Sequence, residues 1–178
     1  MRSETEGTLV RLIEQYKPAL WRLVNSYEAD PARREDLFQE IALGLWQAIP
    51  RFRGDSSERT WLYRIAHNIA ISALDSRRRR ERQESPMSLG IDYASATASA
   101  DETVLEDEQR QVMFDAIRRL PAVDRQLMVL YLEELSYEEI EQISGLSRSA
   151  IATRLSRGRN RLTEAIRGKE RHHDPAAR

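Results

Sequence analysis

Residues 134–162 are the most informative part of the sequence: Glu-Leu-Ser-Tyr-Glu-Glu-Ile-Glu-Gln-Ile-Ser-Gly-Leu-Ser-Arg-Ser-Ala-Ile-Ala-Thr-Arg-Leu-Ser-Arg-Gly-Arg-Asn-Arg-Leu. Ser136 and Glu139 have the spacing of a capping box, so a helix is expected to begin directly after Ser136. Gly145 can adopt the left-handed conformation that ends a helix, and Ser147 can cap the next one. The segment is therefore predicted to form two short helices joined by a glycine turn.

The second predicted helix is apolar on one side and basic elsewhere. The residues expected to face inward are Leu146, Ile151, Leu155 and Leu162. The residues left for the outside are Arg148, Thr153, Arg154, Arg157, Arg159 and Arg161. This layout is typical of a helix-turn-helix whose second helix lies in a DNA major groove. The alternative is a helical hairpin with a solvated basic face, but the two capping signals and the turn length favour the helix-turn-helix.

Composition places the chain among helical proteins of one or two small domains. Of the 178 residues, 40% are hydrophobic and 32% charged, while glycine and proline together number 13 (7 + 6). The chain has no cysteine, which excludes disulfides and thiolate zinc sites. Because no apolar run reaches membrane-spanning length and no signal-peptide pattern is present, we expect a cytoplasmic protein without membrane insertion.

Helical periodicity organises the rest of the chain. In the N-terminal half it predicts a helix over residues 9–27, bent or broken at Pro18, a second from Pro31 to Pro50, and a third over about residues 60–75. In the C-terminal half, one helix starts near Val104 and stops at Pro121. Another holds Val123, Leu127, Leu130 and Tyr131, and the tail after Gly168 is expected to fray.

Residues 83–100 are small and polar without a sustained period, which indicates a flexible linker. The predicted fold is therefore all-α, with two small helical domains and a C-terminal helix-turn-helix. The expected boundaries are an N-terminal domain at 1–82, a linker at 83–103, a C-terminal domain at 104–170 and a tail at 171–178.

Arginines alternate with aromatic residues between Arg51 and Arg64, around a Gly-Asp-Ser-Ser loop. Proteins that hold unpaired nucleotides need cations for the backbone and rings for stacking, and a polar loop can accept a base turned out of the duplex. We expect Trp61 to pack in the core, which leaves the loop as the stronger candidate. The helix that follows is expected to carry Arg64, His67, Asn68, Ile71 and Ser72 on its outer face.

The helix from Pro31 to Ile49 has an unusual outer face. It carries Asp36, Gln39, Glu40, Leu43 and Gln47, with Trp46 adjacent. A purely solvated face needs neither leucine nor tryptophan, although single exposed apolar residues are ordinary. Combined with carboxylates and amides, they suggest a docking surface for another protein.

Together these stretches resemble a bacterial RNA polymerase sigma factor of the extracytoplasmic-function (ECF) group, over nearly the whole chain except the linker and tail. The matching strings are Glu35-Asp36-Leu37-Phe38-Gln39-Glu40-Ile41, Phe52-Arg53-Gly54-Asp55-Ser56-Ser57, Thr60-Trp61-Leu62-Tyr63-Arg64-Ile65-Ala66-His67-Asn68, Leu120-Pro121 and Leu135-Ser136-Tyr137-Glu138-Glu139-Ile140. The resemblance implies two helical domains that both bind core polymerase and promoter DNA.

The resemblance also implies roles for individual residues. Contacts to a coiled coil of the largest polymerase subunit would come from Asp36, Gln39, Glu40, Leu43 and Gln47. The flipped base of the downstream (minus-ten) element would be held by Arg53, Gly54, Asp55, Ser56, Ser57 and Glu58, helped by Asn68 and Ser72. The upstream (minus-thirty-five) element would face Arg148, Ser149, Ala152, Thr153, Ser156 and Arg157. Its phosphates would be held by Arg154, Arg159 and Arg161.

Two residues depart from the family pattern. Arg33 stands where an acidic residue is usual, which puts positive charge at the start of the docking surface. Glu58 stands where an aromatic residue is frequent, and a carboxylate there would repel phosphate unless it accepts a hydrogen bond from a base or faces solvent. Family members are often held inactive by an anti-sigma protein, which is an expected partner beside core RNA polymerase and promoter DNA.

The predicted function is a promoter-specificity subunit that binds core RNA polymerase and directs initiation by recognising and melting promoter DNA. The alternative is a stand-alone helix-turn-helix regulator that binds duplex DNA without polymerase. An enzyme is not expected, because the histidines, His67, His172 and His173, lie in no nucleophile or metal motif. No catalytic residue, metal or cofactor is therefore predicted.

Overall fold

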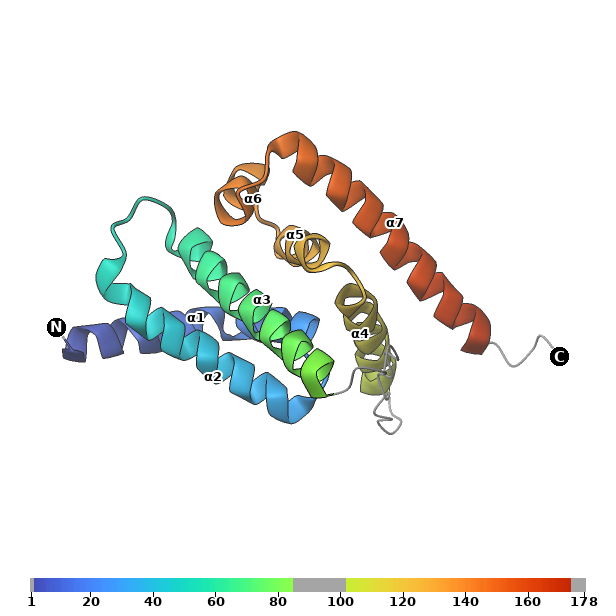
Figure 1. The fold of residues 1–178 in the computed structure, drawn as a ribbon, viewed down its shortest axis with the longest axis horizontal. Helices are drawn as coiled ribbons and strands as arrows, with labels where there is room; N and C mark the ends of the chain where they lie inside the picture. The colour runs from blue at the N-terminus through green and yellow to red at the C-terminus, as the bar shows by residue number, and fades with distance from the viewer. Residues whose placement is uncertain (1, 85–101, 174–178) are drawn as a thin grey trace.

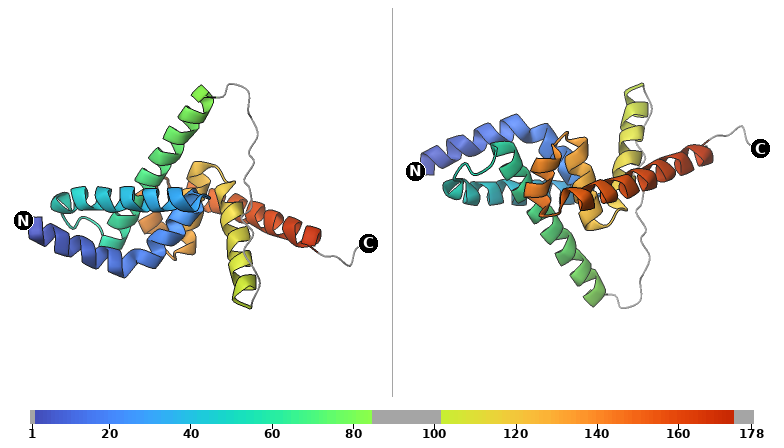
Figure 2. Two further views of the ribbon diagram at one scale, coloured as in Figure 1. Left: turned by 90° about the horizontal axis from the view of Figure 1, so that it is seen from below. Right: turned by 90° about the horizontal axis from the view of Figure 1, so that it is seen from above.

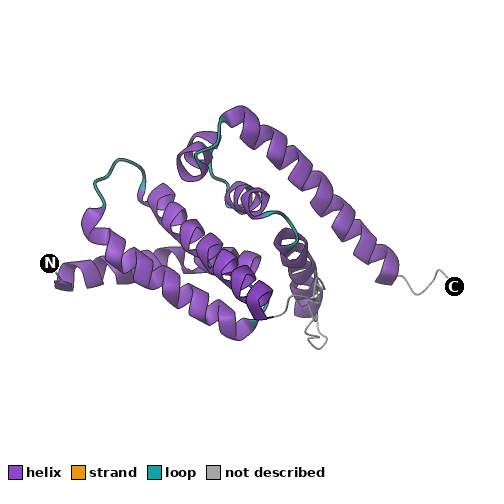
Figure 3. Cartoon of the chain, in the orientation of Figure 1, coloured by secondary structure: helices purple, strands orange, loops and turns teal. Residues whose placement is uncertain are grey.

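The computed structural model describes residues 2–84 and 102–173, and these ranges form α-helices joined by short connections (Figures 1 and 3). The helices are α1 (Arg2–Tyr27), α2 (Pro31–Ala48), α3 (Glu58–Glu84), α4 (Glu102–Arg118), α5 (Ala122–Leu132), α6 (Tyr137–Ser144) and α7 (Arg148–His173), with a 3-10 turn, η1 (Ile49–Arg51), after α2. The predicted all-α fold with two helical domains is confirmed. No helix in the described part of the chain is long and apolar enough to cross a membrane.

Helices α1, α2 and α3 form the N-terminal bundle, in which α2 packs against both of the others. Its core is mainly aliphatic, and Leu20, Ile41, Leu45 and Leu62 are fully buried. Each such side chain contributes roughly 1.5–3 kcal/mol relative to an exposed position. Gly44 allows the close approach of α2 to α3, since a Cβ there would collide with the Ile69 side chain.

The predicted bounds of these helices hold in part: α1 ends at Tyr27 and α2 begins at Pro31 as expected, but α1 begins at Arg2 rather than near residue 9. Asp30 caps α2 as expected, its carboxylate accepting the Ala32 N–H at 2.9 Å. Helix α1 continues through Pro18, which was expected to bend or break it, and α1 changes direction partway along its length (Figure 2). Helix α3 runs to Glu84, well beyond the expected end near residue 75, because nothing in the arginine run stops a helix.

Helices α4 to α7 form the C-terminal bundle, with α7 lying across α4, α5 and α6. Its core includes Leu127, Leu130, Ile140, Ile151 and Leu155, each at most 1% exposed. Two residues assigned to the apolar pattern of the predicted 123–131 helix lie partly outside the core: Val123 is 39% exposed and Tyr131 36% exposed. Helix α7 also continues to His173, past the point where fraying was expected.

The two bundles pack against each other. Helix α1 contacts α4 and α5, and α3 contacts α5 and α6. The predicted linker at 83–103 falls almost entirely outside the described residues.

Candidate nucleic-acid interface

The helix-turn-helix is built by local hydrogen bonds. The Ser136 hydroxyl accepts the Glu139 N–H at 3.2 Å, and the Glu139 carboxylate accepts the Ser136 N–H at 2.8 Å, so the predicted capping box is confirmed. Burial acts to raise the pKa of Glu139, but the hydrogen bonds from Ser136 and Thr60 leave this pKa below its usual value. Gly145 ends α6 with φ of 70°, the left-handed conformation that was predicted.

The N-terminal half of α7 has an inner and an outer side. Ile151, Leu155 and Leu162 are buried, as predicted. The opposite side exposes Ser149, Ala152, Thr153, Ser156 and Arg157. Small side chains beside a guanidinium leave room for base edges and supply hydrogen-bond groups, which is the chemistry a recognition helix needs.

Three arginines that are predicted to hold phosphates contact α5 in the chain without DNA. Arg154 contacts the Asp124 carboxylate at 2.8 Å, and Arg161 contacts its other oxygen at 3.7 Å. The Asp124 side chain is only 12% exposed. Arg159 lies 5.5 Å from the centre of the Tyr131 ring. These contacts fix the arginines on the flanks of α7 and partly neutralise two of them.

Arg148 and Arg157 differ in their surroundings. Arg148 forms an ion pair with Glu138 at 2.6 Å and lies over the Tyr137 ring. The pKa of Glu138 is lowered, first by a backbone hydrogen bond in its own helix turn and then by Arg148. Arg157 is exposed on the outer side and pairs with no carboxylate in the described ranges. Arg157 is therefore the cation on this side with the fewest contacts to give up when DNA binds.

The loop at residues 53–57 is fixed at its two ends. At one end the Phe52 ring packs on Trp61, with ring centres 4.9 Å apart, and Trp61 is 7% exposed, as predicted for a core residue. At the other end Ser57 caps α3, its hydroxyl accepting the Thr60 N–H at 3.0 Å. Between them Gly54 has φ of 77°, and Arg53 and Asp55 are exposed. The middle of the loop is open to a ligand.

Glu58 has a partner that neither sequence-based alternative foresaw. Its carboxylate accepts two hydrogen bonds from the Arg11 guanidinium, at 2.5 and 3.0 Å. The hydrogen bond from Arg11 lowers the pKa of Glu58. The pair ties the start of α3 to α1, and Arg11 offsets the charge that would otherwise repel phosphate.

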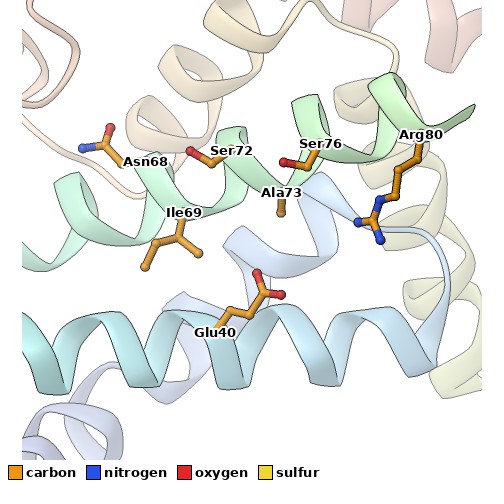
Figure 4. Close-up of a pocket in the computed structure, with 7 residues that line it drawn as sticks. All are labelled: Glu40, Asn68, Ile69, Ser72, Ala73, Ser76 and Arg80. Carbon is orange, nitrogen blue, oxygen red and sulfur yellow. The ribbon is translucent and has the colours of Figure 1, made fainter. Parts of the chain in front are cut away.

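Helix α3 presents a polar row beside a groove. Asn68, Ser72 and Ser76 follow one another at four-residue spacing and line a depression of about 440 Å³ between α2 and α3. In Figure 4, Glu40 rises from α2 towards α3, and Arg80 points back towards the same gap. Asn68 and Ser72, the two residues predicted to assist base capture, therefore line the same groove.

Behind this row lies a buried histidine. His67 is fully buried, and its Nδ1 lies 3.0 Å from the Tyr27 hydroxyl. Burial lowers the pKa of His67 to about 3, so the ring is neutral at physiological pH. The prediction that His67 lies on the outer face of the helix is wrong, because the side chain packs inside the N-terminal bundle beside Tyr27.

The outer face of α2 is exposed as predicted. Asp36, Gln39, Glu40, Leu43 and Gln47 are all exposed, and Leu43 remains 54% accessible. Arg33 lies beside this face, with Nε 3.7 Å from the Asp30 carboxylate. The unusual cation therefore has an acidic neighbour and does not reverse the sign of the whole surface.

Several residues of these surfaces were missed from sequence. Asp124, Tyr131 and Arg11 each hold a candidate DNA-binding residue, yet all three partners lie tens of positions away in the chain. Asp124 is one of many acidic residues in the C-terminal domain, so its position in the sequence does not single it out as a partner of Arg154. Nothing in the sequence connects Arg11 with Glu58.

The fold defines a class: a helical protein of two domains whose C-terminal domain carries a helix-turn-helix. Comparison with known protein families also divides the chain into two domains. Residues 12–80 match the family described as Sigma-70 region 2, and residues 105–162 match Sigma-70, region 4. The helix-turn-helix lies in the second match and the loop in the first.

Known proteins extend the match to most of the chain. The chain is 30% identical over 167 residues to the ECF RNA polymerase sigma-E factor of Escherichia coli K12, covering 87% of this chain and 84% of that protein. It is 28% identical over 162 residues to the RNA polymerase sigma-H factor of Pseudomonas aeruginosa, with the same coverage of each chain.

Two solved structures share the fold. The sigma factor RpoE of Bartonella quintana, solved with the anti-sigma factor NepR, superimposes with a TM-score of 0.67 and 26% identity, over 88% of this chain and 95% of that one. CnrH, solved with the cytosolic domain of CnrY, gives a TM-score of 0.65 over 94% and 95%. Because CnrH is only 18% identical, it supports the fold alone.

The chain belongs to the ECF-type RNA polymerase sigma factors, with sigma-70 regions 2 and 4. It is a non-catalytic subunit that recognises promoters and initiates transcription with RNA polymerase.

Proposed function

We propose that three separate surfaces of this sigma factor divide the work of initiation. The outer face of α2 docks on core polymerase, the loop at 53–57 with Asn68 and Ser72 holds an unpaired base of the downstream element, and the outer side of α7 reads the upstream element as duplex. The observation that carries this proposal is that the three candidate sets, apart from half-buried Ser56, are exposed at once, on different elements, in a single chain.

The docking surface combines charge with apolar area. Asp36 and Glu40 are exposed carboxylates one helical turn apart, and Leu43 lies 54% exposed on the next turn. An exposed leucine framed by carboxylates and amides suits a basic and apolar helical partner. Arg33, near Asp30, marks the edge of this surface.

Promoter melting would follow from tighter binding of the open promoter than of the closed one. A base can enter the loop only after it leaves the duplex, so each contact made there lowers the free energy of the open promoter relative to the closed one. Residues 53–57 are suited to this because their middle is exposed while their ends are fixed. Glu58 is better assigned to positioning, because Arg11 occupies its carboxylate.

Run-off transcription with purified core polymerase tests the docking surface. The double variant Asp36→Lys, Glu40→Lys should reduce promoter-directed transcript by at least about tenfold, since like charges facing a basic partner cost several kcal/mol. Glu14→Lys, an exposed charge reversal on α1, is the matched control. Unchanged initiation by the double variant, with helical content preserved, would remove α2 as the docking surface.

Regulation and location follow from the same assignment. The Bartonella quintana relative was solved with an anti-sigma factor, and we infer that a protein of this kind controls the present chain by covering one or more of the three surfaces. The chain would act in the cytoplasm, where core polymerase is found. Co-purification of the chain from its own cells, followed by mass spectrometry, tests for both core polymerase and such a protein.

A further inference from the structure

A single carboxylate, that of Asp124 in the first turn of α5, lies between two arginines of α7. One of its oxygens is 2.8 Å from Arg154 and the other is 3.7 Å from Arg161. The two arginines lie about two turns apart on the same side of α7. The Asp124 side chain is 12% exposed, whereas those of Arg154 and Arg161 are 43% and 57% exposed. The carboxylate is therefore largely covered, while both guanidinium groups still reach the surface.

Gly158 brings α5 close enough to α7 for this contact. It is buried and lies on the same side of α7, between the two arginines. A Cβ at this position would come within 2.8 Å of the Met128 side chain, so the two helices nearly touch here. Met128 lies one helical turn after Asp124 on α5. The packing of α5 on α7 therefore also holds Asp124 beside the arginines.

Asp124 occupies donors that would otherwise bind phosphate. A guanidinium binds carboxylate and phosphate through the same N–H groups, so Arg154 and Arg161 must share or give up their contacts with Asp124 when a phosphate approaches. The carboxylate would then stay largely covered with fewer partners, which is unfavourable. Each phosphate that either arginine binds is therefore opposed by the loss of a contact inside the protein.

The base-facing side of α7 has no such competitor. Thr153, Ser156 and Arg157 are exposed there and contact no carboxylate in the part of the chain that the structure describes. Phosphate contacts supply nearly all sequence-independent binding of duplex DNA, whereas contacts to base edges carry the sequence information. Asp124 therefore opposes the phosphate contacts on the flank of α7 and leaves the contacts to bases unaffected.

We propose that Asp124 is a specificity-determining residue, which competes with DNA phosphates for Arg154 and Arg161. It lowers the affinity of α7 for duplex of any sequence more than its affinity for the upstream element. The inference rests on the proposed function, in which the outer side of α7 reads that element. Arginines held by Asp124 serve only phosphates close to their fixed positions. A helix seated by base contacts brings phosphates to those positions, whereas a helix on unrelated sequence needs arginines that can adapt.

Asp124→Asn in the full chain tests this inference, because it removes the charge and keeps the size of the side chain. The probes are a short duplex of randomised sequence and the duplex that the wild-type chain selects from the same pool. Fluorescence anisotropy over a salt series measures the affinity for each. The randomised duplex should bind the variant roughly three- to tenfold more tightly, and the slope of log affinity against log salt should steepen by about one to two. The selected duplex should gain less, so the ratio of the two affinities should fall.

Two further variants separate this competition from a general effect of charge or folding. Glu164→Gln removes one negative charge from an exposed position on α7 itself and should leave the ratio of the two affinities unchanged. In a chain that carries Arg154→Gln and Arg161→Gln, the competing cations are absent, so adding Asp124→Asn should not change the salt slope. A merely structural role of Asp124 would give the same effect with or without the arginines. Circular dichroism compares the helical content of every variant with that of the wild type.

Two results would overturn the inference and leave the proposed function standing: a salt slope that Asp124→Asn does not change, or weaker binding of the randomised duplex by this variant. If the wild type bound no duplex but Asp124→Asn bound the randomised one, the competition would be supported. If neither chain bound any duplex, the proposed role of α7 would fail and the inference with it.

Discussion

The helix-turn-helix and the loop at residues 53–57 are both candidates for contact with DNA, but their shapes are fixed in different ways. The helix-turn-helix is set locally, by the capping box of Ser136 and Glu139 and the left-handed Gly145. The loop is set only at its ends, by Phe52 on Trp61 and by Ser57. A duplex has a regular shape that a prefolded element can match, whereas an unpaired base needs a site that closes around it.

The largest expected difference between the two regions is in the free energy of unfolding, and replacing buried Ile151 should show it. Ile151 is fully buried between α7 and its bundle, so Ile151→Ala should lower the free energy of unfolding by about 2–5 kcal/mol. Ser56→Ala in the loop should stay within about 0.5 kcal/mol. Urea denaturation followed by circular dichroism measures both, and equal costs would contradict the distinction.

Acid should weaken the bundle that carries the loop through His67. Its pKa is about 3 in the folded chain and about 6.5 when unfolded, so the unfolded state binds more protons between these values. Stability contributed by the neutral ring is complete above about pH 6.5 and is lost as pH falls, by about 1.4 kcal/mol per unit. Urea titrations at pH 7, 5.5 and 4.5 should show the advantage of wild type over His67→Gln shrinking. A constant difference would mean that His67 is not buried as a neutral ring.

Two arginines of α7 should differ in their contribution to promoter binding. Arg157 is exposed without a carboxylate partner in the described ranges, whereas Arg161 lies 3.7 Å from Asp124. Arg157→Ala should weaken binding of an upstream-element duplex by about 1–3 kcal/mol, and Arg161→Ala by less. Fluorescence anisotropy over a salt series measures this. The reverse order would mean that the flank of α7 facing α5, rather than its outer side, meets DNA.

Gly54 and Gly145 form a matched pair for the smallest effect. Their φ angles are 77° and 70°, and a Cβ added at either would meet no atom within 4 Å, so only backbone strain is at issue. Gly145→Ala should cost about 1 kcal/mol of stability, because α6 and α7 hold the turn. Gly54→Ala should cost less in denaturation, since the loop can relax, and should instead slow open-complex formation. Permanganate footprinting of melted promoter DNA checks the second effect.

The sequence predicted best what is determined locally. The capping box, the left-handed Gly145, the Asp30 cap and the buried Trp61 all follow from neighbouring residues, and each is confirmed. Two helix bounds were predicted less well: α1 begins at Arg2, before its predicted start, and α3 continues to Glu84 because a run of arginines contains no residue that stops a helix. The site assignments drawn from the family resemblance stay predictions.

Contacts between distant residues could not be predicted in the same way. Arg11 with Glu58, Arg154 with Asp124, and Arg22 with Glu133 join residues 30 to 111 positions apart. At such separations in the sequence, any of the many arginines could pair with any of the acidic residues. Only the packing of the helices selects the partners, and these pairs decide which candidate side chains are available to DNA.

The absence of a side chain at Gly44 has a mechanical consequence. Helices α2 and α3 meet so closely there that any added carbon would displace Ile69. The face assigned to polymerase and the polar row that begins at Asn68 therefore belong to one stiff unit. If α2 docks on polymerase as proposed, the close contact of α2 and α3 at Gly44 would also set where an unpaired nucleotide meets α3.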